Sequence, residues 1–206
     1  TNVLCPSSYQ VGQDTLTYVS AMATLTKQIN FLAAIRCGEV HPPMLARTIA
    51  TLDHILKGRL TINIISSDLP GNKLESSKRY ARSREVIEIL KQAWTKDEIN
   101  FKGDFYNINL PSAPAKPFQQ NGGPLLYFGG YSSDGVDLCA EHCDVYLMWP
   151  DTEDKLKILI SNMKAKALTY NRTVQFGLRS HVIVRETEQE AREYASKLIS
   201  KLDYKK

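Results

Sequence analysis

The chain has 206 residues, of which 43% are hydrophobic and 23% charged, and its formal net charge is +4. This composition is typical of a globular protein with one good core or two small ones. No apolar run approaches the roughly 20 residues that span a bilayer, and no basic stripe is interleaved with aromatic residues. The composition therefore argues against a membrane-spanning protein and against a nucleic-acid partner.

Short apolar runs alternate along the chain with longer amphipathic stretches. The runs predict strands at Asn2–Cys5, Asn30–Arg36, Leu60–Ser66, Leu125–Gly129, Asp144–Trp149 and Val174–Val184. The stretches predict helices at Gly12–Ala23, Pro43–Ile55, Lys78–Ala93, Ser133–Glu141, Thr152–Thr169 and Glu188–Leu202. Strict alternation of strand and helix predicts an α/β fold with a parallel sheet.

One stretch, Asn100–Gln120, interrupts this alternation. We expect a small β-hairpin there, followed by an extended proline-rich connection to the next strand. The two ends of the sequence also lie inside predicted elements, because Asn2–Cys5 reads as the middle of a buried strand and a helical pattern runs to Lys206. We therefore expect the sequence to be a piece of a longer chain.

The most informative motif is the β-forming segment Val174–Glu186. It places Arg179 and His181 two residues apart, on the same side of a strand. The other side carries the apolar residues Phe176, Leu178, Val182 and Val184, which we expect to pack under helices. Polar groups on the inner face of a barrel or open sheet are costly unless they are paired or used, so this pair predicts a ligand site. The alternative is that Arg179 and His181 form a structural pair whose polar groups are satisfied within the protein.

A second motif, Leu126–Ser133, reads as a strand, a glycine turn and a helix start. Backbone N–H groups and the hydroxyls of Ser132 and Ser133 at a helix N-terminus suit a phosphate. A tight turn capped by serine is the alternative interpretation. Asn63 lies in an Ile-rich strand, where its amide needs polar partners from a ligand or from the protein itself.

Cysteine usage points away from both disulfides and metal binding. Cys5, Cys37, Cys139 and Cys143 have apolar or helical neighbours, which favours a reducing cytoplasm. On a helix, Cys139, His142 and Cys143 share a face, but their order matches neither a haem-attachment motif nor a zinc pair. We therefore predict no metal site.

The chain resembles the bacterial luciferase-like flavin monooxygenases, and among them the two-component alkanesulfonate monooxygenases that use reduced FMN. The likeness runs nearly end to end, and the order and spacing of its parts make it specific. The matching stretches are Phe31–Arg36, Ala46–Asp53, Gly58-Arg59, Asn63–Ser66, Arg79-Tyr80, Pro124–Gly130, Asp144–Trp149 and Phe176–Thr187.

The resemblance implies a TIM (β/α)8 barrel of the luciferase-like type, forming one domain over residues 1–206. A complete barrel takes roughly 250 residues, so this chain would supply about strands two to seven and be partial at both ends. The first strand, the last strand and the mobile insertion before it would be missing.

The resemblance also implies roles for particular residues. Arg179 and His181 would be catalytic, with Arg179 facing the sulfonate or an oxygen intermediate and His181 stabilising or protonating such an intermediate. Asn63 would bond the flavin ring, and most of the other cofactor-binding residues would hold the phosphate or ribityl chain. The implied cofactor-binding residues are Asn63, Ser66, Tyr80, Gly129, Gly130, Ser132 and Ser133.

The implied activity is oxygenation of a small organosulfur compound such as an alkanesulfonate, with release of sulfite and an aldehyde. An NAD(P)H-dependent flavin reductase would supply the reduced FMN, and the enzyme would be a homo-oligomer in the cytoplasm. The chain departs from the sulfonate enzymes in Ser7–Gly12, which lacks their cysteine, and in Ser66–Gly71. The alternatives are a deazaflavin (F420)-dependent oxidoreductase, an alkane or sulfone monooxygenase of the same fold, and a non-catalytic flavin-binding protein on a shortened barrel.

Overall fold

A computed structural model of the chain describes residues 2–10 and 12–202. Its strands are β1 (Asn2–Cys5), β2 (Asn30–Arg36), β3 (Leu60–Ile65), β4 (Glu98–Lys102), β5 (Asn107–Pro111), β6 (Leu126–Phe128), β7 (Val145–Met148) and β8 (Gln175–Leu178). Its helices are α1 (Thr15–Leu25), α2 (Pro42–Leu56), α3 (Ser76–Thr95), α4 (Ser133–His142), α5 (Glu153–Leu168) and α6 (Glu188–Ile199).

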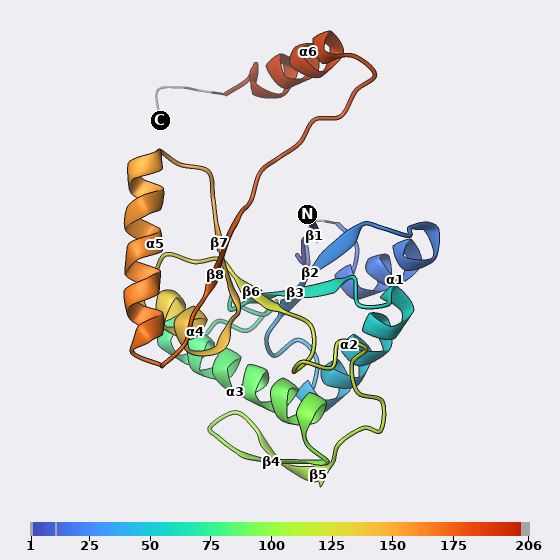
Figure 1. Cartoon of the computed structure of the whole chain (residues 1–206), viewed down its shortest axis with the longest axis vertical. Coiled ribbons are helices and arrows are strands. Elements are labelled where there is room, and N and C mark those ends of the chain that lie inside the picture. The colour runs from blue at the N-terminus through green and yellow to red at the C-terminus, as the bar shows by residue number, and fades with distance from the viewer. Residues whose placement is uncertain (1, 11, 203–206) are drawn as a thin grey trace.

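Six strands form one parallel sheet in the order β1-β2-β3-β6-β7-β8 (Figure 1). Within the described ranges, β1 and β8 each pair on one side only, so the sheet does not close into a complete barrel. The predicted α/β class with an incomplete barrel is therefore confirmed. Helices α1 to α5 follow the strands as crossover connections, which parallel pairing requires.

Local sequence explains where these elements begin and end. Helix α2 begins with prolines at its first positions, where a missing N–H costs nothing, and ends at Lys57 in the left-handed conformation with φ 52°. Gly58 follows with φ 80°, a conformation that L side chains rarely adopt. The core lies between the sheet and α1 to α5, and alternate residues of β3, such as Ile62 and Ile64, point into it.

The interruption after α3 is the predicted hairpin, formed by antiparallel β4 and β5. The carboxylate of Glu85 in α3 accepts the backbone N–H groups of Asp104, Phe105 and Tyr106 at the hairpin turn, at 2.7 to 3.0 Å. Charge-assisted bonds of this kind are among the strong ones. The hairpin is therefore fixed to α3, on the side of the helix away from the sheet (Figure 1).

The strand predicted at Val174–Val184 is too long. Strand β8 ends at Leu178, and the chain then runs in extended form to α6, which stands apart from the sheet (Figure 1). Phe176 packs against the core, but Leu178, Val182 and Val184 are 55%, 78% and 75% exposed. The expectation that they pack under helices is wrong, because α6, the helix that follows them, has no buried residue.

Candidate functional site

The inner face of the sheet is the face that points away from the helices. Strand register places Asn63 of β3 beside Tyr127 of β6, and Tyr127 beside Val145 of β7. These residues alternate with core residues along their strands, so they face the space that a closed barrel would enclose. The side chain of Asn2 donates to the Tyr127 hydroxyl at 3.0 Å, which joins β1 to β6 across this face.

A cavity of about 640 Å³ lies on the inner face, within the usual range for small-molecule sites. Its walls come from β1, β2, β3, β6, β7 and β8 and from the segment after β8. Arg179 and Ser180 line it together with Thr61, Tyr127 and Gly177. The sheet therefore brings one predicted catalytic residue, Arg179, to a cavity of suitable size.

Arg179 and His181 both lie beside Trp149, where β7 ends. The guanidinium carbon of Arg179 is 4.0 Å from a Trp149 ring centroid, and the His181 ring is 6.1 Å from Trp149. The hydroxyl of Tyr131 accepts the backbone N–H of Trp149 at 2.9 Å, which fixes the start of this loop. The predicted pair is thus on one side of the segment, although neither residue is in a strand and His181 does not line the cavity.

Sequence reasoning missed Trp149 and Tyr131. The available signal was their position, since each closely follows a parallel strand, and residues at the carboxyl ends of such strands meet at one edge of the sheet. Both side chains are exposed, at 44% for Trp149 and 51% for Tyr131. Large aromatic side chains left open at this edge are available to a ligand.

The predicted phosphate-binding residues gather at the N-terminus of α4. Ser132 caps this helix by accepting the backbone N–H of Gly135 at 3.2 Å, and its hydroxyl lies 3.0 Å from that of Tyr80 in α3. A Cβ on Gly135 would lie 3.0 Å from the Tyr80 hydroxyl, and a Cβ on Gly130 would lie 2.9 Å from the Phe128 ring. The structure thus brings Tyr80, Gly130 and Ser132 together, in a setting that needs small residues.

Ser133 is the first residue of α4, exposed and next to this group, and Gly129 precedes it in the turn. A Cβ on Gly129 would lie 2.9 Å from the carbonyl oxygen of Leu147. Tyr146 donates its hydroxyl to the Gly130 carbonyl at 2.8 Å. Burial, with Tyr131 adding to it, raises the pKa of Tyr146 to about 12, so this hydroxyl stays a neutral donor that holds the turn.

Two further predicted residues carry polar atoms that lack partners among the described residues. The Asn63 side-chain oxygen and the Ser66 hydroxyl are buried and make no hydrogen bond. Buried polar atoms normally have partners, so a ligand with complementary donors would stabilise this part of the site. These two atoms and the turn at α4 fit a cofactor that has a polar ring system at one end and a phosphate at the other.

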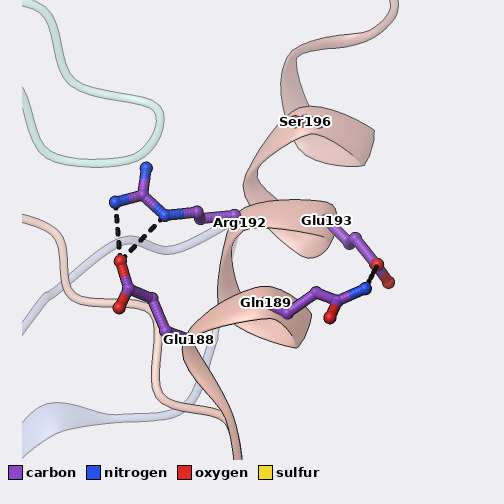
Figure 2. Close-up of a pocket in the computed structure, with 5 residues that line it drawn as sticks. All are labelled: Glu188, Gln189, Arg192, Glu193 and Ser196. Carbon is purple, nitrogen blue, oxygen red and sulfur yellow. Dashed lines mark hydrogen bonds and ion pairs between the residues drawn. The ribbon is translucent and has the colours of Figure 1, made fainter.

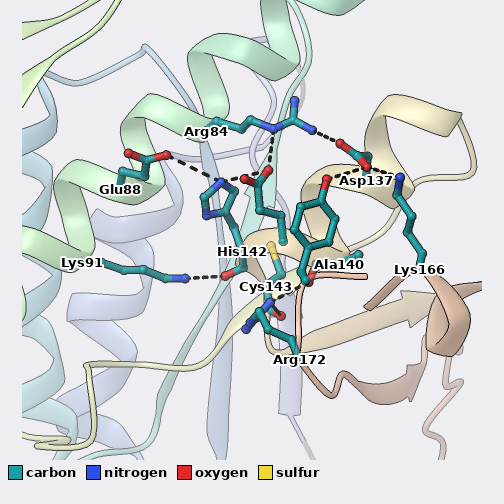
Figure 3. A network of polar contacts seen from close by, with 11 residues as sticks. Arg84, Glu88, Lys91, Asp137, Ala140, His142, Cys143, Lys166 and Arg172 are labelled. Atoms are coloured by element: carbon teal, nitrogen blue, oxygen red, sulfur yellow. Dashed lines mark hydrogen bonds and ion pairs between the residues drawn. The ribbon is translucent and has the colours of Figure 1, made fainter. Parts of the chain in front are cut away.

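A second polar cluster, outside the cavity, joins α3, α4 and the end of α5 (Figure 3). Arg84 donates to Asp137 at 2.6 Å and to Glu141 at 2.9 Å. His142 is buried beside them, and burial lowers its pKa to about 4. Across the described residues, no group of three His, Cys, Asp or Glu side chains is arranged to hold a metal ion.

The hollow beside α6 is different in kind, because one helix supplies all the residues that line it (Figure 2). Its polar side chains contact each other: Arg192 forms an ion pair with Glu188 at 2.6 Å, and Gln189 donates a hydrogen bond to Glu193 at 2.9 Å. Side chains from different elements do not meet in this hollow, so we assign it no functional role. As far as the structure describes the chain, none of its helices has the length and apolar character needed to cross a membrane.

Comparison with known proteins gives a consistent result. The sequence matches the family described as luciferase-like monooxygenase over residues 2–206. It is 60% identical over 203 residues to a sulfoquinovose monooxygenase of Agrobacterium fabrum and 49% identical over 209 residues to one of Novosphingobium aromaticivorans. Each match covers 98% of this chain but 53% and 58% of the relatives, so the chain spans little more than half their length.

Solved structures show the same fold. A long-chain alkane monooxygenase superposes with a TM-score of 0.76 at 26% identity, over 88% of this chain and 49% of that one. An EDTA monooxygenase from Chelativorans sp. BNC1 superposes with a TM-score of 0.81 at 17% identity, over 94% and 52%. These likenesses extend over nearly all of the present chain and about half of each neighbour.

Proposed function

We propose, for a chain that belongs to the luciferase-like monooxygenase family, that it forms the catalytic part of a flavin-dependent monooxygenase acting on an organosulfonate. The names of the two relatives, at 60% and 49% identity, suggest sulfoquinovose, a sulfonated sugar, as the first substrate to test. A simple alkanesulfonate is the second. An NAD(P)H-dependent flavin reductase as partner and a homo-oligomeric assembly complete the proposal.

The observation that carries this proposal is the environment of Arg179. Its side chain lines the inner-face cavity, and among the described residues no carboxylate forms an ion pair with it. An unpaired guanidinium beside a cavity suits an anion with several oxygens, such as a sulfonate. The aromatic ring of Trp149 holds the guanidinium in place without neutralising it.

The residues at the N-terminus of α4, at the end of β3 and on α3 would suit FMN. Ser132, Ser133 and Tyr80 would hold its phosphate or ribityl chain, at a helix end that favours negative charge. The partnerless atoms of Asn63 and Ser66 would bond the polar edge of the ring, with Gly129 and Gly130 allowing close approach. When bound in its reduced form, FMN would supply the two electrons that O2 needs for oxygenation.

The residues of this chain would bind, orient and supply protons. Arg179 would bind the sulfonate and place the adjacent carbon in the cavity, and exposed His181 would exchange a proton beside it. Overall, the carbon–sulfur bond breaks and sulfite leaves, one oxygen atom of O2 becomes the aldehyde carbonyl, and the other becomes water. An imidazole suits this role because its two ring nitrogens can donate and accept a proton.

The experiment that tests this function uses the full-length protein that contains this chain. Binding of oxidised and reduced FMN is titrated without oxygen, and air is then admitted with sulfoquinovose or an alkanesulfonate while sulfite is measured. We expect preference for reduced FMN and release of sulfite. Binding of FMN without sulfite from any sulfonate would overturn the oxygenation, and binding of a deazaflavin in place of FMN would overturn the cofactor.

Trp149 gives a smaller test of the same site. Replacing it with leucine removes the ring under Arg179, whereas Trp149→Phe keeps an aromatic face. Stacking at an exposed site contributes about 0.5–1 kcal/mol, so the leucine variant should lose about threefold in kcat/KM for the sulfonate. Steady-state sulfite release measures this. Equal losses in the leucine and phenylalanine variants would contradict a stacking role.

A further inference from the structure

Arg36 ends β2 on the inner face of the sheet, in register with Ile65 of β3. Its side chain reaches two loops that come from different strands. One terminal nitrogen donates to the Ser67 hydroxyl and, at 2.7 Å, to the Asp68 carbonyl, both in the loop after β3. The other donates to the Ser7 carbonyl, in the loop after β1, at 3.3 Å. One guanidinium thus joins both loops to β2.

The loop after β3 is also tied internally, by Arg79 of α3. Arg79 donates to the Leu74 carbonyl at 2.7 Å and pairs with the Asp68 carboxylate at 3.3 Å. The backbone N–H of Leu74, and then Arg79, lower the pKa of Asp68, which therefore stays ionised. Arg79 makes no bond to the loop after β1 among the described residues, so the link between the two loops depends on Arg36.

The charge of Arg36 is not neutralised by these contacts. Among the described residues its acceptors are two backbone carbonyls and a hydroxyl, and the carboxylate of Asp68 pairs with Arg79 instead. Carbonyl and hydroxyl oxygens can bond a guanidinium strongly, but they carry no formal charge to cancel its own. The arrangement therefore leaves a positive charge at the carboxyl edge of the sheet, where barrel enzymes place their loops and their substrates.

We propose that Arg36 is a positioning residue that clasps the loops after β1 and β3 and thereby controls how the anionic substrate enters the site. The proposal rests on the proposed function for its substrate. These are also the two loops in which the sequence differs from the alkanesulfonate enzymes it resembles, so they are suited to set substrate choice. Arg36 acts through the loops and not on the reacting atoms.

The test replaces Arg36 with methionine, which removes the clasp and the charge, and with lysine, which keeps the charge. In the full-length protein we expect Arg36→Met to raise KM for the sulfonate by about tenfold or more, because both loops lose their tie to β2 and the edge loses a positive charge. We expect kcat and the affinity for FMN to stay within about threefold. Arg36→Lys should keep the salt dependence of KM that the parent protein shows, because the positive charge remains, but its KM should still be higher than that of the parent.

Arg59 supplies a matched control. It bonds the carbonyls of Ile29 at 2.6 Å, Thr26 at 3.0 Å and Leu56 at 3.0 Å, so it also joins separate segments through neutral acceptors. It precedes β3, however, and so lies at the opposite edge of the sheet. Arg59→Met should lower the unfolding temperature without a selective rise in KM.

Amide hydrogen exchange of the loops gives a result that does not depend on activity. Arg36→Met should speed exchange in residues 66–75 and in the described residues of the loop after β1, and Arg59→Met should not. Unchanged exchange and unchanged KM in Arg36→Met, or an equal KM rise in Arg59→Met, would overturn the clasp. If the parent protein releases no sulfite, the proposed function fails, while the exchange data still decide the clasp.

Discussion

Replacing Arg179 with alanine in the full-length protein should lower kcat/KM for the sulfonate by about a hundredfold or more. The guanidinium lines the cavity and has no carboxylate partner among the described residues, so its donors remain free for substrate oxygens. Two charge-assisted bonds at about 1.5 kcal/mol each correspond to this loss. Arg179→Lys should recover only part of it, because an ammonium cannot reproduce the planar fork. Sulfite release at several substrate concentrations separates KM from kcat.

Arg185 provides the control for this prediction. It too stacks on an aromatic ring, with its guanidinium carbon 3.8 Å from the Tyr194 centroid, but it does not line the cavity. Arg185→Ala should therefore leave kcat/KM within about twofold, since exposed substitutions have small effects. If Arg185→Ala costs as much as Arg179→Ala, the loss reflects the extended segment as a whole and not the sulfonate contact.

Acidification should destabilise the protein between about pH 6.5 and pH 4 through His142. Burial lowers the pKa of this imidazole to about 4, further lowered by Lys91, Arg84 and Arg172 and opposed by Glu141. The folded protein keeps the ring neutral while the unfolded chain takes up a proton. Its contribution is therefore complete above pH 6.5 and is lost as the pH falls toward 4, a change of about 3 kcal/mol.

Urea unfolding at several pH values measures this contribution. His142→Gln should flatten the pH dependence, whereas His54→Gln, at an exposed position, should leave it unchanged. Glu88 lies 3.8 Å from the His142 ring, and burial, then Glu141 and Glu85, raise its pKa, an effect that works in the opposite direction. A parent protein whose free energy of unfolding is the same at about pH 7 and about pH 5 would contradict the prediction.

Most of the fold could be predicted from the sequence, because apolar runs and amphipathic stretches alternate without ambiguity. Strands β1 to β3 and the hairpin lie where the pattern indicated, and helix ends differ by a few residues. The exception is the segment after Leu178. Its alternating Val182 and Val184 have strong strand propensity, but a strand also needs a neighbour, and periodicity does not report whether the neighbour is present.

The site could be predicted only in part. The family resemblance indicated Tyr80 and Ser132, which the structure places 3.0 Å apart, although their sequence positions alone carry no such information. Trp149 and Arg36 were missed because a tryptophan or arginine at a strand end also fits an ordinary structural role. Their significance depends on their contacts. Trp149, at the end of β7, contacts Arg179 and His181 after β8, and Arg36, at the end of β2, bonds the loops after β1 and β3.

The hairpin of β4 and β5 bears on how the chain folds. Each strand of the large sheet pairs with the strand of that sheet that precedes it in sequence, and in most pairs one helix connects the two strands. The connection from β3 to β6 is longer, because it contains the hairpin as well as α3. Closing a longer loop costs more entropy, and late pairing slows folding. Local formation of α3 and the hairpin, held by Glu85, shortens that loop before its ends meet. We therefore expect the Glu85 carboxylate, on the far side of α3 from the sheet, to help bring the two halves of the site together during folding.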